Sequence, residues 1–184
     1  DSINNLLPIL LSPPASSFTA IDPVLFQWQA LNGAVDYRFE LRQGGQTGPL
    51  LQAQIVEGTQ FSISSIVEGT YTWGVQGHNA TSSSLFNYRS LTIDRTAPSA
   101  PLLLIPSIAA TIANTAFSFQ WQSGSDTSPT TDSLFVLDAN SILVRALPVS
   151  GNAWPDSLGS GSFQWYVRTT DAAGNGTSST LRNL

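Results

Sequence analysis

The sequence contains no cysteine, no lysine and a single histidine, His78. Without cysteine the chain can form neither a disulfide framework nor a thiolate zinc site, and it has no thiol nucleophile. Without lysine it cannot build the Gly-Lys loop with which nucleotide-hydrolysing enzymes hold phosphate. Any catalytic triad or proton relay built on imidazole would have to use His78.

Charged side chains are also scarce. They make up 10% of the 184 residues, far below the roughly 25% of an average soluble protein. All seven basic residues are arginines scattered along the chain, and the net charge is −5. Nucleic acid and anionic membrane surfaces both attract basic patches, so we expect neither as a partner. A neutral polar surface of this kind is common in secreted and cell-surface β-proteins.

Long apolar runs are missing as well. The longest, residues 6–11, is interrupted by Pro8 and is far shorter than the roughly 20 residues that span a bilayer. The sequence therefore predicts no membrane span. It also lacks the basic start of a signal peptide, so a signal, if one existed, has been removed from this chain. A lipid tether upstream of residue 1 would be consistent with this start. Residues 1–6 indicate a polar tether that leads into the first strand.

The chain contains an internal duplication. Phe26–Gln29 recurs as Phe119–Gln122, and Gly69–Val75 recurs in similar form as Gly161–Val167. Two further blocks recur in the same order: Pro8–Pro13 as Pro101–Pro106, and Arg89–Leu91 as Arg182–Leu184. Such self-similarity is the signature of a repeated structural unit.

The duplication predicts two domains, residues 1–94 and 95–184. Each has close to the roughly 100 residues of a β-sandwich. The join at residues 94–101 places Pro98 and Pro101 among small residues. This composition predicts a short and fairly stiff linker.

The main pattern along the chain is an alternation of apolar and polar residues. At residues 35–41, Val, Tyr, Phe and Leu alternate with Asp, Arg and Glu, which predicts a strand with one face in a core and the other in water. Gly-containing pairs separate such runs. The strands expected in the first domain are residues 7–12, 24–30, 35–42, 50–55, 60–64, 70–78 and 85–93. The sequence thus predicts an all-β chain of two tandem seven-stranded antiparallel β-sandwiches.

Several blocks together resemble a known group. They are Phe-x-Trp at 26–28, Gly-Thr-Tyr-x-Trp-x-Val at 69–75, Asp-x-Thr-Ala-Pro-x-x-Pro at 94–101, and Thr-Asp-Ala-Ala-Gly-Asn at 170–175. They resemble bacterial fibronectin type III-like and immunoglobulin-like tandem repeats of cell-surface proteins, over nearly the whole chain. The resemblance implies a β-sandwich fold and a role as spacer, adhesion module or assembly surface. The second domain departs from the pattern at residues 123–132, which leaves its strand register open.

Groups suited to catalysis are few. His78 follows an expected strand with no carboxylate beside it in the sequence, which favours an exposed loop position. A pair of carboxylates could act in glycoside hydrolysis, but aspartate also favours turns by bonding its own backbone. We expect turn positions for the second-domain aspartates: Asp126, Asp132, Asp138, Asp156 and Asp171. The sequence therefore predicts a protein that is not an enzyme, with no catalytic residue.

Metal and sugar sites are each less favoured than a structural explanation of the same residues. Residues 171–176 have the oxygen ligands and glycines of a calcium loop, and Asp94 in the linker could join them, but the closing Glu of an EF-hand is missing. We expect no metal and no cofactor. Sugars stack on exposed aromatics, yet core packing is expected for all five tryptophans. Four are paired across the repeat at inward positions, and the fifth aligns with Phe61: Trp28, Trp73, Trp121, Trp165 and Trp154.

The leading hypothesis from the sequence is a non-catalytic extracytoplasmic binding or scaffolding module at a bacterial cell surface or outer membrane. It would be a surface lipoprotein or an accessory subunit of a cell-envelope complex, and its partner another protein of that envelope. The alternative is a carbohydrate-binding module or adhesin. Exposed aromatics on one sheet face would favour sugar, whereas a long unpaired edge strand or an apolar patch would favour a protein partner.

Overall fold

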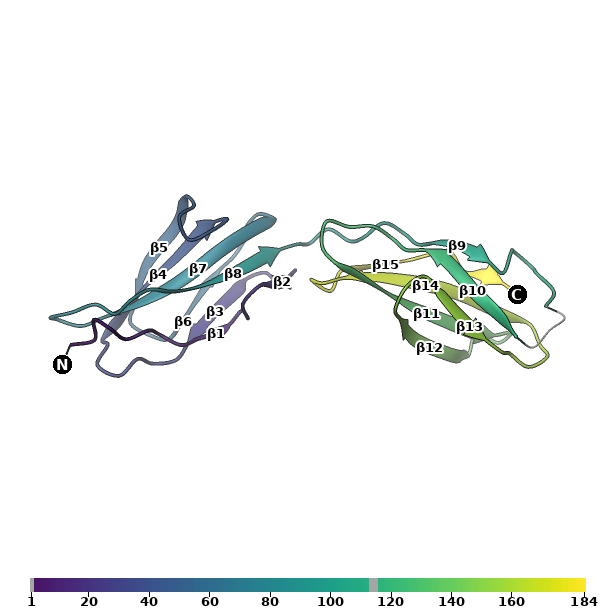
Figure 1. Ribbon diagram of the computed structural model, residues 1–184, viewed down its shortest axis with the longest axis horizontal. Coiled ribbons are helices and arrows are strands. Elements are labelled where there is room, and N and C mark those ends of the chain that lie inside the picture. Colours follow the sequence, from purple (N-terminus) through teal and green to yellow (C-terminus); the bar gives the residue numbers. More distant parts are fainter. Residues whose placement is uncertain (1, 113–115) are drawn as a thin grey trace. The chain divides into compact units, whose positions relative to one another are not determined.

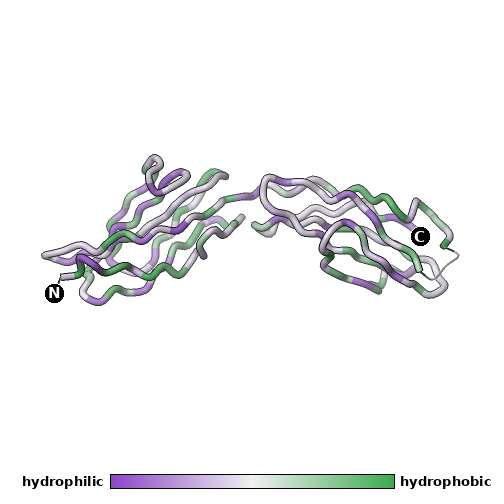
Figure 2. The backbone as a smooth tube through the Cα atoms, in the orientation of Figure 1, coloured by the Kyte–Doolittle hydropathy of each residue, from purple (hydrophilic) through white to green (hydrophobic). Residues whose placement is uncertain are grey.

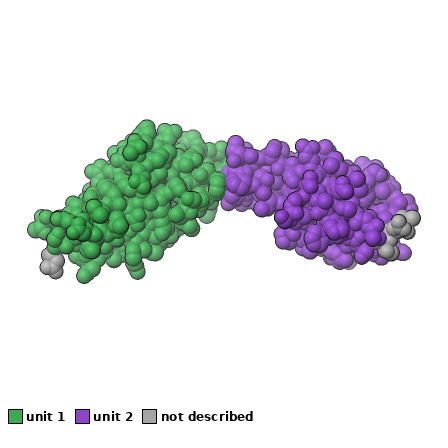
Figure 3. Space-filling view, in the orientation of Figure 1, with its two compact units in different colours: residues 1–95 green, residues 96–184 purple. Residues whose placement is uncertain are grey.

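A computed structural model describes residues 2–112 and 116–184 of the chain. It divides into two compact units, Asp1–Arg95 and Thr96–Leu184 (Figure 3). Both units consist of strands and connecting loops, so the chain is all-β as predicted (Figure 1). The described part contains no helix that is long and apolar enough to cross a membrane.

Unit 1 is built from two sheets. Its strands are β1 (Leu10–Ser12), β2 (Ser17–Thr19), β3 (Val24–Trp28), β4 (Asp36–Gln43), β5 (Leu50–Val56), β6 (Gln60–Ile63), β7 (Gly69–His78) and β8 (Asn87–Ile93). One sheet has the order β1-β3-β6 and the other β2-β8-β7-β4-β5. Strand β2 was not among the expected strands, because three residues are too few to show alternation. It pairs with β8 in parallel, whereas the other pairs in this unit are antiparallel.

Unit 2 repeats this plan with its own strands. They are β9 (Leu102–Ile105), β10 (Phe117–Gln122), β11 (Thr130–Asp138), β12 (Leu143–Val149), β13 (Ala153–Asp156), β14 (Phe163–Asp171), β15 (Gly176–Ser178) and β16 (Arg182–Asn183). One sheet has the order β13-β10-β9. The other has the order β12-β11-β14-β15, with β16 also paired to β14.

The core of each unit lies between its two sheets and is centred on a pair of tryptophans. In unit 1 these are Trp28 on β3 and Trp73 on β7, and in unit 2 Trp121 on β10 and Trp165 on β14; all four are at most 2% exposed. Apolar residues from both sheets of each unit surround them. Figure 2 shows the hydrophobic and hydrophilic segments that follow one another along the strands. The predicted core positions of these four tryptophans are confirmed, and Trp154 packs half-buried against the unit 2 core.

The strand register that the sequence left open is settled by the pairing of β11. Val136 pairs with Trp165 as Leu41 pairs with Trp73. Counting back four residues, Asp132 takes the place that Tyr37 has in unit 1. A carboxylate at an inward position was the reason why the alternation failed to show in the second repeat.

The N-terminal segment is part of unit 1. Ile3 is 1% exposed, and its backbone N–H donates to Ser82 Oγ at 3.1 Å. Further along, the Leu85 N–H donates to the Leu6 carbonyl at 2.9 Å. The prediction of a tether at residues 1–6 is therefore wrong for residues 2–6, because an apolar side chain within the polar segment is anchored in the fold.

The tryptophan cores predict the cost of truncation. Trp28→Ala and Trp121→Ala should each lower the free energy of unfolding of their own unit by about 3–5 kcal/mol, because a large cavity replaces a fully buried ring. Urea unfolding followed by hydrogen exchange would report each unit separately. Ile21→Ala is the control, since Ile21 is 69% exposed and should change stability by less than about 0.5 kcal/mol. A Trp variant as stable as the wild type would contradict the core assignment.

Candidate functional site

His78 lies at the end of β7 and not in an exposed loop, so that prediction is wrong. Its ring is half-buried, with Nδ1 3.1 Å from Asp36 Oδ1 and Nε2 3.2 Å from Gln76 Oε1. The partner carboxylate is 42 residues away in the sequence, on β4, and only strand pairing brings it to the imidazole. Both ring nitrogens lie within hydrogen-bond distance of a side-chain oxygen, so these contacts fix the orientation of the imidazole between β4 and β7.

Four of the second-domain aspartates hold local backbone, as predicted for them. Oδ1 of Asp126 accepts the Ser128 N–H at 3.1 Å, and Oδ1 of Asp138 accepts two N–H groups of the following turn. Asp156 accepts the Ser157 N–H at 2.7 Å and lies 3.5 Å from Arg145 Nε. These carboxylates serve turns and strand ends.

Asp132 is the exception, because it lies inside β11 and is 5% exposed. Its Oδ2 accepts the Trp121 indole N–H at 2.6 Å and the Ser123 hydroxyl at 2.5 Å, and Oδ1 accepts the Thr169 hydroxyl at 2.5 Å. The prediction of a turn role for Asp132 is wrong. Its three neutral donors satisfy a carboxylate that would otherwise be costly to bury, so its role is structural.

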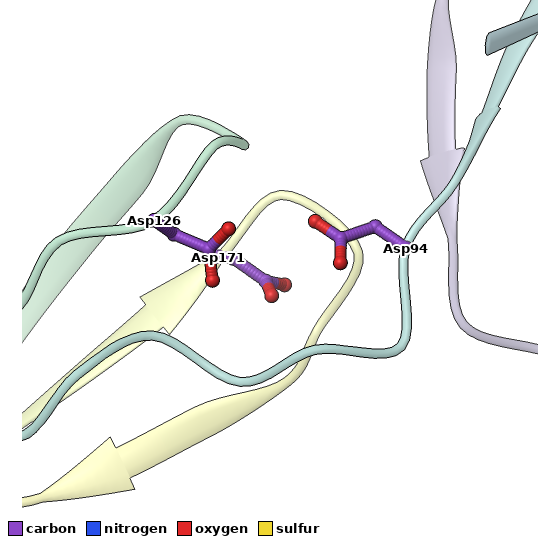
Figure 4. Close-up of side chains that lie close together, drawn as sticks. All are labelled: Asp94, Asp126 and Asp171. Atoms are coloured by element: carbon purple, nitrogen blue, oxygen red, sulfur yellow. The ribbon is translucent and has the colours of Figure 1, made fainter. Parts of the chain in front are cut away.

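The loop after β14 organises itself around Asp171, which Figure 4 shows with Asp126 and Asp94. Asp171 accepts the N–H groups of Ala173 and Asn175 on Oδ1, both at 2.9 Å, and the Asn175 side-chain amide on Oδ2 at 2.8 Å. Gly174 completes the turn with φ of 95°. Within unit 2, a carboxylate oxygen of Asp126 and one of Asp171 lie within 4.8 Å of each other. These two residues offer oxygen atoms that could bind a cation.

The outer face of the larger unit 1 sheet carries a buried charge cluster. Glu40 on β4 is 3% exposed, and both Arg38 and Arg42 hold it with N–O distances of 2.8 Å. The Tyr88 hydroxyl on β8 lies 3.4 Å from the same carboxylate. Tyr88 reaches it by crossing β7 at Gly74, where any Cβ would lie 2.2 Å from the tyrosine ring.

Burial and charge shift the pKa values of Glu40 and Tyr88 in opposite directions. Burial raises the pKa of Glu40, but the hydrogen bonds from Arg42 and Arg38 outweigh it and hold that pKa below its ordinary value of 4.5. Burial, and after it the negative charge of Glu40, raises the pKa of Tyr88. The tyrosine therefore stays protonated near neutral pH, and the cluster ties β4, β7 and β8 together.

The outer face of the larger unit 2 sheet has a different composition. Phe135 on β11 and Tyr166 on β14 are directly paired across the strands, and their rings stack with centroids 4.7 Å apart at 5°. Both are partly exposed. Arg168, two residues further along β14, is exposed and lies against Gly176. Within the described residues its guanidinium has no hydrogen-bond or ion-pair partner.

Apolar residues of the edge strand β12 extend this face. Ala146 is exposed and pairs with Phe135, and Leu143 is 53% exposed and pairs with Leu137. We name the surface of Phe135, Leu143, Ala146, Tyr166 and Arg168 the unit 2 outer face. The sequence alone does not reveal this face, because Phe135 and Tyr166 become neighbours only when β11 pairs with β14. A signal was nevertheless available. Phe135 and Tyr166 each lie between two apolar, inward-facing residues of their strand, so this alternation indicates that each aromatic ring faces outward.

Solved structures share this architecture. The fibronectin(III)-like modules of Clostridium thermocellum CbhA match with a TM-score of 0.63 at 10% identity, over 96% of this chain and 90% of that one. The FN1–FN3 domains of chicken CNTN1 match with a TM-score of 0.58 at 13% identity, over 100% of this chain and 68% of that one. No family model and no curated protein matches the sequence.

The fold is therefore a tandem fibronectin type III-like β-sandwich, as the sequence resemblance implied. In these units a rigid core supports sheet faces and strand edges on which partners can dock.

The charge cluster predicts a pH-dependent loss in Glu40→Gln. At pH 7 the free energy of unfolding of the variant should be about 1–3 kcal/mol lower than that of the wild type, because two arginines lose a charged acceptor. Since the folded pKa of Glu40 lies below the unfolded one, its contribution is complete above the unfolded pKa and disappears as the pH falls through the folded pKa. Urea unfolding at pH 7 and pH 3 should show the difference shrinking at pH 3. Glu57→Gln, at an exposed residue, is the control, and an equal loss at both pH values would contradict the assignment.

The Asp171 loop predicts little dependence on calcium. Its carboxylate already accepts three hydrogen bonds from its own loop, so the loop does not need an ion to fold. Adding chelator should shift the melting temperature by less than about 2 °C, which is a fraction of a kcal/mol for a domain of this size. If calcium raises the melting temperature by more, and Asp171→Asn removes the rise, Asp126 and Asp171 are ligands.

Proposed function

We propose that the chain is a non-catalytic, extracytoplasmic binding or scaffolding module that holds another protein of a bacterial cell envelope through the unit 2 outer face. In this proposal it belongs to a surface lipoprotein or to an accessory subunit of an envelope complex. The observation that carries the proposal is the combination of two stacked, partly exposed aromatic rings with an uncompensated arginine on one sheet face.

The residue types on this face match those of protein interfaces. Aromatic residues and arginine are enriched at such interfaces, whereas lysine, glutamate and aspartate are depleted, and tyrosine and arginine are frequent hot spots. A partner with an apolar side chain for the Leu143–Ala146 edge and a carboxylate for Arg168 would complement it. Tyr166 and Phe135 stand on two packed strands, so little side-chain entropy is lost when they are covered.

The same geometry argues against sugar as the ligand. Phe135 and Tyr166 are partly exposed aromatics on one sheet face, a feature that would favour sugar. Each ring, however, covers one face of the other at 4.7 Å, which leaves less aromatic surface for a sugar ring to stack on than two separate rings would. The tryptophans, which would give the largest platforms, lie in the cores or, for Trp154, half-buried against one. These observations favour the protein-binding hypothesis over the carbohydrate-binding module or adhesin.

The composition of the surface supports the extracytoplasmic assignment. Only 10% of the residues are charged, so the surface carries mainly neutral polar side chains, a composition that is common in secreted and cell-surface β-proteins. His78 and the aspartates have hydrogen-bond partners that serve strands and turns, which supports a role without catalysis.

The unit 2 outer face predicts the result of photo-crosslinking in cells that make the protein. A photoreactive amino acid at Ala146 should trap one discrete protein, whereas the same group at Ile108, which is 75% exposed in a loop of unit 2, should not. Tyr166→Ala with Arg168→Ala should weaken binding of that purified partner roughly 30-fold or more, which corresponds to hot-spot losses of about 2 kcal/mol. The melting temperature of the variant should stay within a few degrees of the wild type. Trapping of glycan in place of protein, or unchanged affinity in the double variant, would overturn the proposal.

A further inference from the structure

Strand β5 is an edge strand with unusual composition. It lies at one end of the order β2-β8-β7-β4-β5, and within the described residues its backbone pairs with β4 alone. Its seven residues, Leu-Leu-Gln-Ala-Gln-Ile-Val, contain no charge and no proline. Leu51 and Ile55 are each 51% exposed. A long, uncharged, apolar edge of this kind is a template for pairing with another strand.

The second repeat supplies an internal comparison. Strand β12 occupies the same position in unit 2, at the end of the order β12-β11-β14-β15, and it pairs with β11 as β5 pairs with β4. It contains Arg145 and Pro148. A charge and a proline, which has no N–H to donate, are the usual means of protecting an edge. Of these two equivalent edges, β12 is therefore protected and β5 is open.

The order of residues in β5 identifies a second copy of this chain as the occupant of that edge. Residues 51–55, Leu-Gln-Ala-Gln-Ile, are symmetrical in chemistry about Ala53. When two such strands run antiparallel about a two-fold axis at Ala53, Leu51 lies opposite Ile55, Gln52 opposite Gln54, and Ala53 opposite itself. Every cross-strand pair then joins like with like, and no charges face each other.

We infer that two copies of this chain associate through β5–β5 pairing, joining their five-stranded sheets across a two-fold axis at Ala53. The β4–β5 ladder is regular over residues 52–56, and its shift falls at Leu51, between the Leu41–Gln52 and Arg42–Leu50 pairs, so residues 52–56 set the register. Ala53 and Ile55 pair with Glu40 and Arg38, so they lie on the outer face. In the proposed register they form an apolar row with Leu51 of the second copy, which lies opposite Ile55. On the opposite face, the amides of Gln52 and Gln54 can hydrogen-bond across the axis. Such a two-fold interface is self-complementary and closes at two copies.

This inference does not rest on the proposed function, since it concerns the other unit and a different surface. A single strand pair is at the small end of interface sizes, so the association is expected to be weak and dependent on concentration. Sedimentation velocity of the full chain between about 5 and 500 µM should show a rising dimer fraction. Sedimentation as a monomer over that whole range would overturn the inference.

Charge at the axis provides the first test by mutation. Ala53→Lys places two like charges opposite each other and should lower the dimer association constant at least tenfold. Ser62→Lys, at an exposed residue of β6 in the same unit, adds the same charge elsewhere and should leave association unchanged. An equal effect of both variants would show that net charge, and not the strand register, governs association.

A register test separates self-pairing from capture of another strand. Leu51→Glu alone and Ile55→Lys alone should each weaken the dimer, because a charge then faces an apolar residue. The double variant should restore it, since the two new charges lie opposite each other in the proposed register. Failure of the double variant to recover, when it remains folded by circular dichroism, would contradict the register.

Covalent trapping keeps the inference testable even if a charged variant fails to fold. The chain has no native cysteine, so Ala53→Cys introduces one thiol. Directly opposed residues in antiparallel strands have Cα atoms about 4.5 or 5.5 Å apart, which both permit a disulfide. Oxidised glutathione should therefore convert Ala53→Cys to a covalent dimer at least tenfold faster than Ser62→Cys. Equal rates would overturn the inference.

Discussion

Burial of two large aromatic rings between two sheets is the constraint on which both units depend. Trp28 and Trp73 in unit 1, and Trp121 and Trp165 in unit 2, fill positions that alternate with outward-facing residues on their strands. Because the side-chain period of a strand is two, fixing these rings inward fixes which residues face out. The outer faces and edges are consequences of the core register, and they are free to vary without affecting it.

The two repeats show what this freedom permits. The position of Tyr37 in unit 1 is held by Asp132 in unit 2, where the Trp121 indole N–H finds an acceptor that Trp28 lacks. On the outside, unit 1 has a charge cluster around Glu40, whereas unit 2 has stacked aromatics and Arg168, whose guanidinium has no partner among the residues that the structure describes. The same backbone plan therefore carries different surface chemistry, as is usual for folds that host many functions.

The sequence predicts the fold well because the core signal is local and repeated. Alternation at residues 35–41 and the duplicated Phe-x-Trp block locate strands and inward tryptophans. The surface chemistry was harder to predict because it is made by residues far apart in the chain. Asp36 meets His78 across 42 residues, and Phe135 meets Tyr166 only through strand pairing. Asp132 was misassigned since a buried carboxylate depends on three donors whose positions no local pattern reveals.

Self-pairing and partner binding reinforce each other if both occur, because they use different units. A dimer formed through β5 contains two copies of the unit 2 outer face. When several copies of the partner lie close together at the cell surface, one unit 2 outer face of the dimer binds first. The second face then binds at an effective concentration that is set by its link to the first through the dimer and not by the bulk solution. Two weak interfaces can then give a high overall affinity, although each interface alone remains small. Of the two equivalent edges, β5 lacks a charge and a proline whereas β12 has both. A chain with both of these edges open could pair at each of them and form an unlimited chain of sheets.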